Sequence, residues 1–158
     1  MEIPCTAPRV LIIGIGNDYR SDDSVGLVVA RRLRRLVDNG VTILEESGEG
    51  TSLVERWRCG ESVIVIDAVS SESRPGRVLR FDASTESIPA RHDRQSTHGF
   101  GLAEAIDLAR SLNSMPARLI VYGIVGKNFG AGTALSREVE EAVKQVVERV
   151  KQEIQAAV

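Results

Sequence analysis

The sequence predicts an α/β domain built around a mostly parallel β-sheet. Three observations support this prediction. Short uninterrupted apolar runs are typical of strands that are buried on both faces of a parallel sheet. Apolar residues at helical spacing separate these runs, which predicts alternating strands and helices. One connection, residues 70–76, is shorter than the dozen or so residues that a parallel crossover needs, so one strand should run antiparallel.

The first half of the chain alternates strands and helices. The predicted strands are the apolar runs at residues 10–16, 41–44 and 63–66. Amphipathic stripes follow the first two runs and consist of Val25, Val29, Leu33 and Leu36, and of Leu53, Val54 and Trp57. Because successive crossovers are right-handed, the first strand should lie between the second and the third if the winding direction reverses.

The second half begins with the antiparallel strand, predicted at residues 77–81. A polar stretch at 82–100 follows and contains both histidines, His92 and His98; loops of this length are uncommon inside a domain unless they are functional or disordered. A helix, a strand at 119–125 and a last helix complete the chain, with Ser136 as the expected N-cap of that helix. The apolar stripes of the two helices are Leu102, Ile106, Ala109 and Leu112, and Val139, Val143, Val146, Val150 and Ile154.

Composition excludes several classes of protein. A length of 158 residues predicts one domain, spanning residues 1–158, with enough core to fold without metal or disulfide staples. A net charge of -2 provides no basic field for nucleic acid. The longest apolar run, 10–16, is far shorter than the roughly 20 residues of a membrane span, and the N-terminal residues lack a basic region followed by an apolar one. We therefore expect no membrane partner and a cytoplasmic location. Cys5 and Cys59 belong to no metal or redox motif.

Polar residues gather where the first and third strands end. Asp22 and Asp23 follow the first strand, and Asp67 ends the third. Ligands of such sheets bind outside the carboxyl ends of the strands at the point of reversal, and His98 lies on a loop long enough to reach it. Two carboxylates and an imidazole suit a divalent transition metal with open positions for water or substrate. The residues do not distinguish nickel, zinc, iron or manganese.

Gly14 and Gly16 begin a dinucleotide-binding fingerprint, but Tyr19 occupies the position of its third glycine.

Each of the acidic residues and the histidine, taken singly, is also compatible with an ordinary structural role. Acidic residues in the first turn of a helix are favoured by the helix dipole. An aspartate at a strand end often bonds the backbone of the following turn, and a loop histidine often has no ligand. The metal hypothesis therefore rests on the combination and not on any one residue.

Three segments resemble the signature of the hydrogenase maturation proteases, the endopeptidases that trim the large subunit of nickel-iron hydrogenases. Residues 14–26 read GIGNDYRSDDSVG, residues 65–68 read VIDA and residues 96–102 read STHGFGL. All three occur in the order and at the spacing of that family. The similarity extends weakly over nearly the whole chain.

The resemblance implies both a site and a fold. It implies that Asp23, Asp67 and His98 are the metal-contacting and catalytic residues, and that Gly16, Asn17, Asp22 and Gly99 contact the substrate. It implies a three-layer α/β/α sandwich of the phosphorylase/hydrolase type, whose five-stranded, mostly parallel sheet has one antiparallel strand and places the fifth strand between the third and the fourth. It also implies nickel brought by the substrate, without an organic cofactor.

The function expected from the resemblance is that of an endopeptidase. It would remove a C-terminal extension from the nickel-loaded precursor of a hydrogenase large subunit, as a monomer or weak homo-oligomer, and would count as an aspartic-type protease because its site residues are carboxylates. Two alternatives stay open at this point. One is a non-catalytic α/β module that binds a nucleotide or a metal, and the other is a zinc-dependent hydrolase of small amides that uses the same three residues.

Overall fold

The strands and helices follow the predicted alternation. The computed structural model describes residues 9–38, 40–58, 60–85 and 101–157. The strands are β1 (Val10–Ile15), β2 (Val41–Glu46), β3 (Ser62–Val69), β4 (Val78–Asp82) and β5 (Arg118–Val125). The helices are α1 (Val25–Arg34), α2 (Gly50–Trp57), α3 (Leu102–Ser111) and α4 (Arg137–Ala157), and a 3-10 turn, η1 (Ser21–Ser24), precedes α1. None of these helices is long and apolar enough to cross a membrane.

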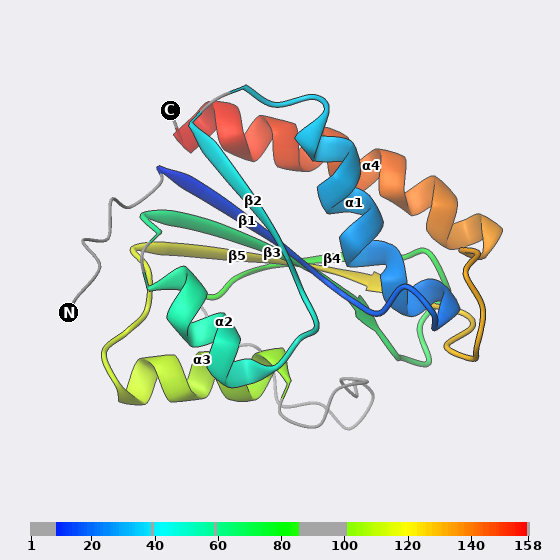
Figure 1. Ribbon diagram of the computed structural model, residues 1–158, viewed down its shortest axis with the longest axis horizontal. Helices are drawn as coiled ribbons and strands as arrows, with labels where there is room; N and C mark the ends of the chain where they lie inside the picture. The colour runs from blue at the N-terminus through cyan, green and yellow to red at the C-terminus, as the bar shows by residue number, and fades with distance from the viewer. Residues whose placement is uncertain (1–8, 39, 59, 86–100, 158) are drawn as a thin grey trace.

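The five strands form one sheet in the order β2-β1-β3-β5-β4 (Figure 1). β1 pairs in parallel with β2 and β3, and β3 pairs in parallel with β5. β4 runs antiparallel to β5, with Arg80 opposite Tyr122. The position of β1 between β2 and β3 and the single antiparallel strand confirm the sequence predictions. The position of β5 between β3 and β4 agrees with what the resemblance implied.

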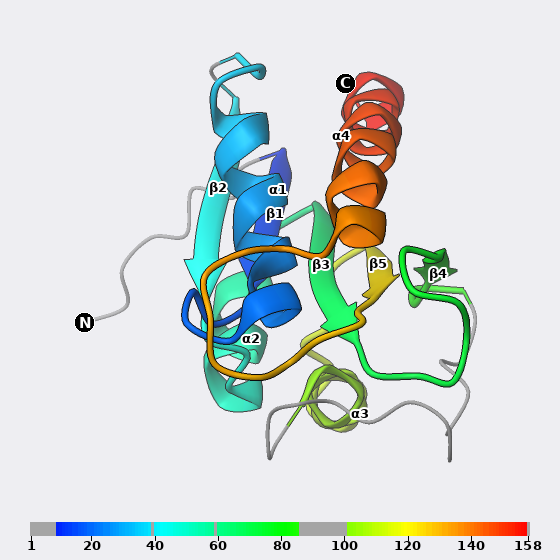
Figure 2. The ribbon, with the colours of Figure 1, turned by 90° about the vertical axis from the view of Figure 1, so that its right-hand side faces the viewer.

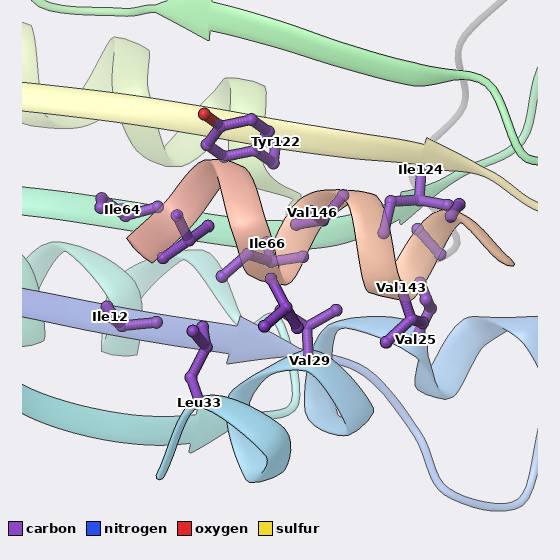
Figure 3. Packing of buried hydrophobic residues seen from close by; sticks show 14 of the residues in the cluster. Ile12, Val25, Val29, Leu33, Ile64, Ile66, Tyr122, Ile124, Val143 and Val146 are labelled. Atoms are coloured by element: carbon purple, nitrogen blue, oxygen red, sulfur yellow. The ribbon is translucent and has the colours of Figure 1, made fainter. Parts of the chain in front are cut away.

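Helices cover both faces of the sheet (Figures 1 and 2). Alternate side chains of the central strands point to opposite faces, so that Ile12 and Ile64 pack towards α1 and α4, whereas Leu11 and Val63 pack towards α2 and α3. Figure 3 shows the first of these layers, in which Val29 of α1 and other residues of the helices lie against Ile66 and its neighbours. Burial on both faces explains why the strands read as continuous apolar runs.

Two predicted positions differ from the structure. Leu36 continues the apolar stripe of the first helix in the sequence, but α1 ends at Arg34 and Leu36 is 55% exposed. Leu112 likewise lies after the end of α3 and is 59% exposed. Apolar spacing continues in both cases beyond the helical backbone, so periodicity alone placed the helix ends too late.

Candidate active site

The acidic residues gather at the carboxyl end of the parallel strands. β1 leads through a short loop into η1, which contains Asp22 and Asp23. Asp67 lies in the last part of β3, the neighbour of β1. Asp22 and Asp23 are fully buried, and Asp67 is 6% exposed. The structure therefore places all three at the edge of the sheet where the sequence predicted a ligand site.

Glycines allow η1 and α1 to approach the strand ends closely. A Cβ atom on Gly16 would lie 2.3 Å from the backbone oxygen of Asp23, and one on Gly26 would lie 2.3 Å from the backbone oxygens of both Ile15 and Ile66. Such distances are far inside van der Waals contact, so no larger residue fits without movement of the backbone. The glycines of the first motif are thus needed for packing between turn and strands, which gives Gly16 a structural role and accounts for the glycine spacing without a dinucleotide.

Asp23 and Asp67 form an acidic pair inside the protein. Burial and, to a lesser degree, the negative charge of Asp23 raise the pKa of Asp67 to about 8, although a hydrogen bond from the Ala68 N–H opposes them. That hydrogen bond joins the Ala68 nitrogen to Asp67 Oδ1 over 2.8 Å. At neutral pH the metal-free protein therefore keeps a proton on Asp67. Loss of this proton would leave two neighbouring carboxylates, whose repulsion a bound divalent cation would neutralise.

The Asp22 carboxylate binds the loop between β5 and α4. Its Oδ1 accepts a hydrogen bond from the backbone of Ser136 at 2.7 Å, and its Oδ2 accepts bonds from the Lys127 backbone, the Asn128 backbone and the Ser136 hydroxyl at 2.8–2.9 Å. Burial alone would raise the pKa of Asp22, but these hydrogen bonds outweigh it and lower the pKa. The contacts describe a side chain that shapes the loop, and they give no support to the substrate-binding role expected of Asp22.

The loop before η1 and the loop between β5 and α4 are joined along their length. Gly132 donates its N–H to Tyr19 and accepts the N–H of Ser21, which makes a short parallel bridge between Arg20 and Gly132. The Asp22 N–H donates to the Asn128 oxygen at 2.9 Å. Figure 2 shows the β5–α4 loop, in orange, running past the start of α1 and back. We call these joined segments, residues 19–22 and 126–136, the clasp.

Asn17 also has a local structural contact. Its Oδ1 accepts a hydrogen bond from the Tyr19 N–H at 2.9 Å, which is an Asx turn. Asp18 next to it forms an ion pair with Arg31 of α1 at 2.8 Å. The Asn17 side chain thus fixes the course of the loop after β1, and its predicted contact with substrate stays a prediction.

The histidine motif lies outside the described residues, so the structure does not place His98, Gly99 or His92. Within the described part of the chain, no group of three or more His, Cys, Asp and Glu side chains is arranged to hold a metal ion. The structure thus brings together two of the three predicted ligands, Asp23 and Asp67. A site formed with His98 stays a prediction.

Sequence reasoning missed the clasp. Lys127 and Asn128 act through backbone N–H groups, which no side-chain pattern reveals. Ser136 stands directly before α4, where an N-cap was predicted, but its hydroxyl donates to Asp22. One sequence signal could have pointed to this contact. Two acidic residues are adjacent here, although a single metal ligand needs only one, so the other was free for a structural role.

Known proteins similar to this chain agree with one another. The family model HycI, hydrogenase maturation protease, matches residues 27–153. The hydrogenase 2 maturation protease of Escherichia coli (strain K12) is 26% identical over 146 residues, which cover 90% of this chain and 88% of that protein. The hydrogenase expression/formation protein HupD of Bradyrhizobium diazoefficiens is 31% identical over 119 residues, covering 73% of this chain and 61% of the relative.

Solved structures give the same result. The [NiFe] hydrogenase maturation protease HybD from Thermococcus kodakarensis superimposes with a TM-score of 0.71 at 28% identity, over 91% of this chain and 97% of that one. The hydrogenase maturating endopeptidase HybD from E. coli has a TM-score of 0.79 at 21% identity, over 94% and 93% of the two chains, and shows the shared fold. The chain belongs to the hydrogenase maturation protease family.

Proposed function

We propose that this protein is the endopeptidase that removes a C-terminal extension from the nickel-loaded precursor of a nickel-iron hydrogenase large subunit. Family membership makes it a hydrogenase maturation protease and therefore a hydrolase. The observation that supports the nickel-dependent part of the proposal is the buried pair of Asp23 and Asp67, at the strand ends where this fold class binds ligands.

The pair suits a metal that arrives with the substrate. Carboxylate oxygens and an imidazole nitrogen are suitable donors for a divalent transition metal, so Asp23 and Asp67 would bind nickel of the precursor together with His98. Because the pKa of Asp67 is about 8, binding would displace a proton from that carboxyl. The bound nickel would then place the scissile peptide and polarise its carbonyl group or a water molecule.

The proposal also includes the partner, the location and the cofactor requirement of the reaction. The partner is the hydrogenase large-subunit precursor, met in the cytoplasm by a monomer or weak homo-oligomer. The reaction needs no organic cofactor, nucleic acid or membrane. The name aspartic-type describes the carboxylates of the site. Asp23 and Asp67 would bind the metal, and Asp67 would act as the base on the peptide.

The central experiment compares two forms of the precursor. The protein is incubated with a cognate precursor, either nickel-loaded or nickel-free, and loss of the C-terminal peptide is followed by mass spectrometry. We expect cleavage of the nickel-loaded form only, because the acidic pair needs the cation to bind the substrate. Equal cleavage of both forms would contradict nickel recognition. Stoichiometric zinc in the purified protein, with hydrolysis of small amides, would support the alternative zinc hydrolase.

Substitutions test the residues. Asp67→Asn and His98→Ala should each abolish processing. The first keeps the shape of a side chain that already carries a proton at neutral pH, so the fold should persist, which circular dichroism can check. Asp107→Asn, on the exposed face of α3, is the matched control and should process at the wild-type rate. Normal processing by both site variants would remove the proposed site.

A further inference from the structure

Two adjacent aspartates of one short turn have different partners. Asp23 belongs to η1, which packs against β3, and its negative charge contributes to the raised pKa of Asp67. Asp22 is bound by backbone and side-chain donors of the β5–α4 loop. Since Asp22 and Asp23 are consecutive residues of one 3-10 turn, the hydrogen bonds of Asp22 also constrain the backbone position from which the Asp23 side chain projects.

The turn holds a backbone conformation that it would not favour alone. Ser21 has a φ of 51°, in the left-handed region that residues other than glycine rarely adopt. Its N–H donates to the Gly132 oxygen and its Oγ to the Gly130 oxygen, both at 2.9 Å. The clasp therefore supplies the contacts that keep this conformation, and without them the turn would relax towards the ordinary helical region.

Gly16 fixes the other side of the turn. The backbone oxygen of Asp23 lies against Gly16 with no room for a Cβ between them. Asp23 is thus held from the strand side by the Gly16 backbone and from the loop side through Asp22. Of these two supports, only Asp22 acts through a side chain that can be substituted without adding volume.

We propose that Asp22 is a positioning residue, which holds Asp23 beside Asp67 by binding the β5–α4 loop. The inference rests on the proposed function, because the geometry that Asp22 maintains is that of the proposed nickel site. It gives the β5–α4 loop a role in holding the site. The exposed residues Lys127 and Asn128 of this loop donate backbone hydrogen bonds directly to Asp22. A purely structural Asp22, which only attaches α4 to the turn, would affect stability and leave the site unchanged.

The test compares two carboxylate-to-amide variants on the same scaffold. Asp22→Asn keeps the volume but replaces one acceptor oxygen by an NH2 group that faces donors. Glu153→Gln is the matched control, because Glu153 also accepts several side-chain hydrogen bonds, from Arg80, Arg118 and Tyr122, and lies near the other end of α4. Both variants should have a lower Tm than the wild type.

Processing of the nickel-loaded precursor is then measured below both unfolding transitions. Asp22→Asn should lower kcat/KM at least tenfold, because the pair both binds the nickel of the precursor and places the peptide, whereas Glu153→Gln should keep the wild-type kcat/KM. A normal kcat/KM in Asp22→Asn, or an equal loss in Glu153→Gln, would overturn the proposal. Ser136→Ala removes a single hydrogen bond to Asp22 and replaces Asp22→Asn if that variant does not fold; we expect a smaller loss of kcat/KM in the same direction.

A second measurement does not depend on activity. The Ala68 N–H donates to Asp67, and its NMR signal reports on the acidic pair at a position distant in sequence from Asp22. This signal should shift in Asp22→Asn and stay in place in Glu153→Gln; an unshifted signal in both would overturn the proposal. If the wild type fails to cleave the nickel-loaded precursor, the proposed function is wrong, and the Ala68 signal still decides whether Asp22 positions the pair.

Discussion

Gly14, Gly16 and Gly26 bring α1 and η1 into direct backbone contact with β1 and β3. A Cβ on Gly14 would lie 2.3 Å from the Gly26 oxygen, so two of these glycines meet each other. The buried carboxylates of η1 reach the strand ends only because this approach is so close. At the residue scale, the site depends on the absence of side chains as much as on the presence of acidic ones.

This packing predicts a large effect of Gly26→Ala. Alanine is favoured over glycine inside a helix by about 1 kcal/mol. The added methyl group would meet two backbone oxygens at 2.3 Å, and overpacking of this kind costs typically about 1–3 kcal/mol and sometimes more. Because backbone cannot rotate away, we expect the upper part of that range and a net loss of about 2 kcal/mol in the free energy of unfolding, measured with urea.

Gly130→Ala is the control for this prediction. Gly130 is exposed, and its nearest contact would be the Asn128 side chain at 3.2 Å, which can adjust. Its free energy of unfolding should stay within about 0.5 kcal/mol of wild type. Equal stability of the two variants would mean that the contact at Gly26 relaxes without cost.

The sequence predicts the acidic pair better than it predicts the partners of Asp22. Topology alone placed Asp22 or Asp23 close to Asp67, because they follow or end two neighbouring strands, and the resemblance singled out Asp23. The partners of Asp22 could not be predicted, since they lie 105 to 114 positions away and two of the three donate only through backbone N–H groups. No local pattern encodes such a contact.

At the scale of elements, α4 is tied to the edge of the sheet by a polar cluster around Glu153. This carboxylate accepts hydrogen bonds from Arg80 of β4 and Arg118 of β5, both at 2.7 Å, and from the Tyr122 hydroxyl at 2.9 Å. Burial would raise the pKa of Glu153, but Arg80 and the Tyr122 hydroxyl, with Arg118, lower it below its ordinary value of 4.5. Burial and the bond to Glu153 raise the pKa of Tyr122 to about 12.

These shifts predict how stability depends on pH. The raised pKa of Tyr122 means that its contribution is complete below its ordinary pKa of 10.0 and is lost as pH rises towards 12. Tyr122→Phe should therefore lower the free energy of unfolding by about 1–2 kcal/mol at pH 8, and its deficit relative to wild type should shrink between pH 10 and 12. For Glu153, whose pKa is lowered, the contribution is lost on the acid side, as pH falls below 4.5.

Tyr19→Phe is the control, measured by the same urea titrations. Tyr19 is 75% exposed, so its substitution should change stability by less than about 0.5 kcal/mol at every pH. A deficit of Tyr122→Phe that stays constant to pH 12 would show that the hydroxyl contributes nothing to the pH dependence.

The sequence predicted elements well where one local feature determines them. The short connection at residues 70–76 predicted an antiparallel β4, and the structure confirms it, because chain length limits direct return paths. No local feature of the sequence predicts the position of β5 between β3 and β4. This position depends on which strand edges remain open once the others have paired, and only the resemblance supplied it.

At the scale of the whole molecule, one sheet separates two apolar layers. The layer of α1 and α4 and the layer of α2 and α3 share the strands β1, β3 and β5, whose alternate residues belong to each. Neither layer has a sheet of its own. Loss of either one would expose one face of every central strand, so the two layers should unfold together.

The single tryptophan makes this testable. Trp57 is fully buried in the layer of α2 and α3, so its fluorescence reports on that layer, whereas far-UV circular dichroism reports on all helices, including the long α4. We expect urea transitions from the two probes to coincide in midpoint and slope. A fluorescence transition that precedes the dichroism transition would show that the α2 and α3 layer unfolds alone.

The hydrogen bonds of Asp22 also set the order in which the site can be assembled during synthesis. Asp22 and Asp23 leave the ribosome long before residues 127–136, to which Asp22 binds. A contact between residues distant in sequence cannot form until both of them have emerged. A nascent chain that already has β1, α1 and β3 still lacks the partners of this carboxylate. If Asp22 positions Asp23 as proposed, the acidic pair takes its final arrangement only after residues 127–136 have been translated.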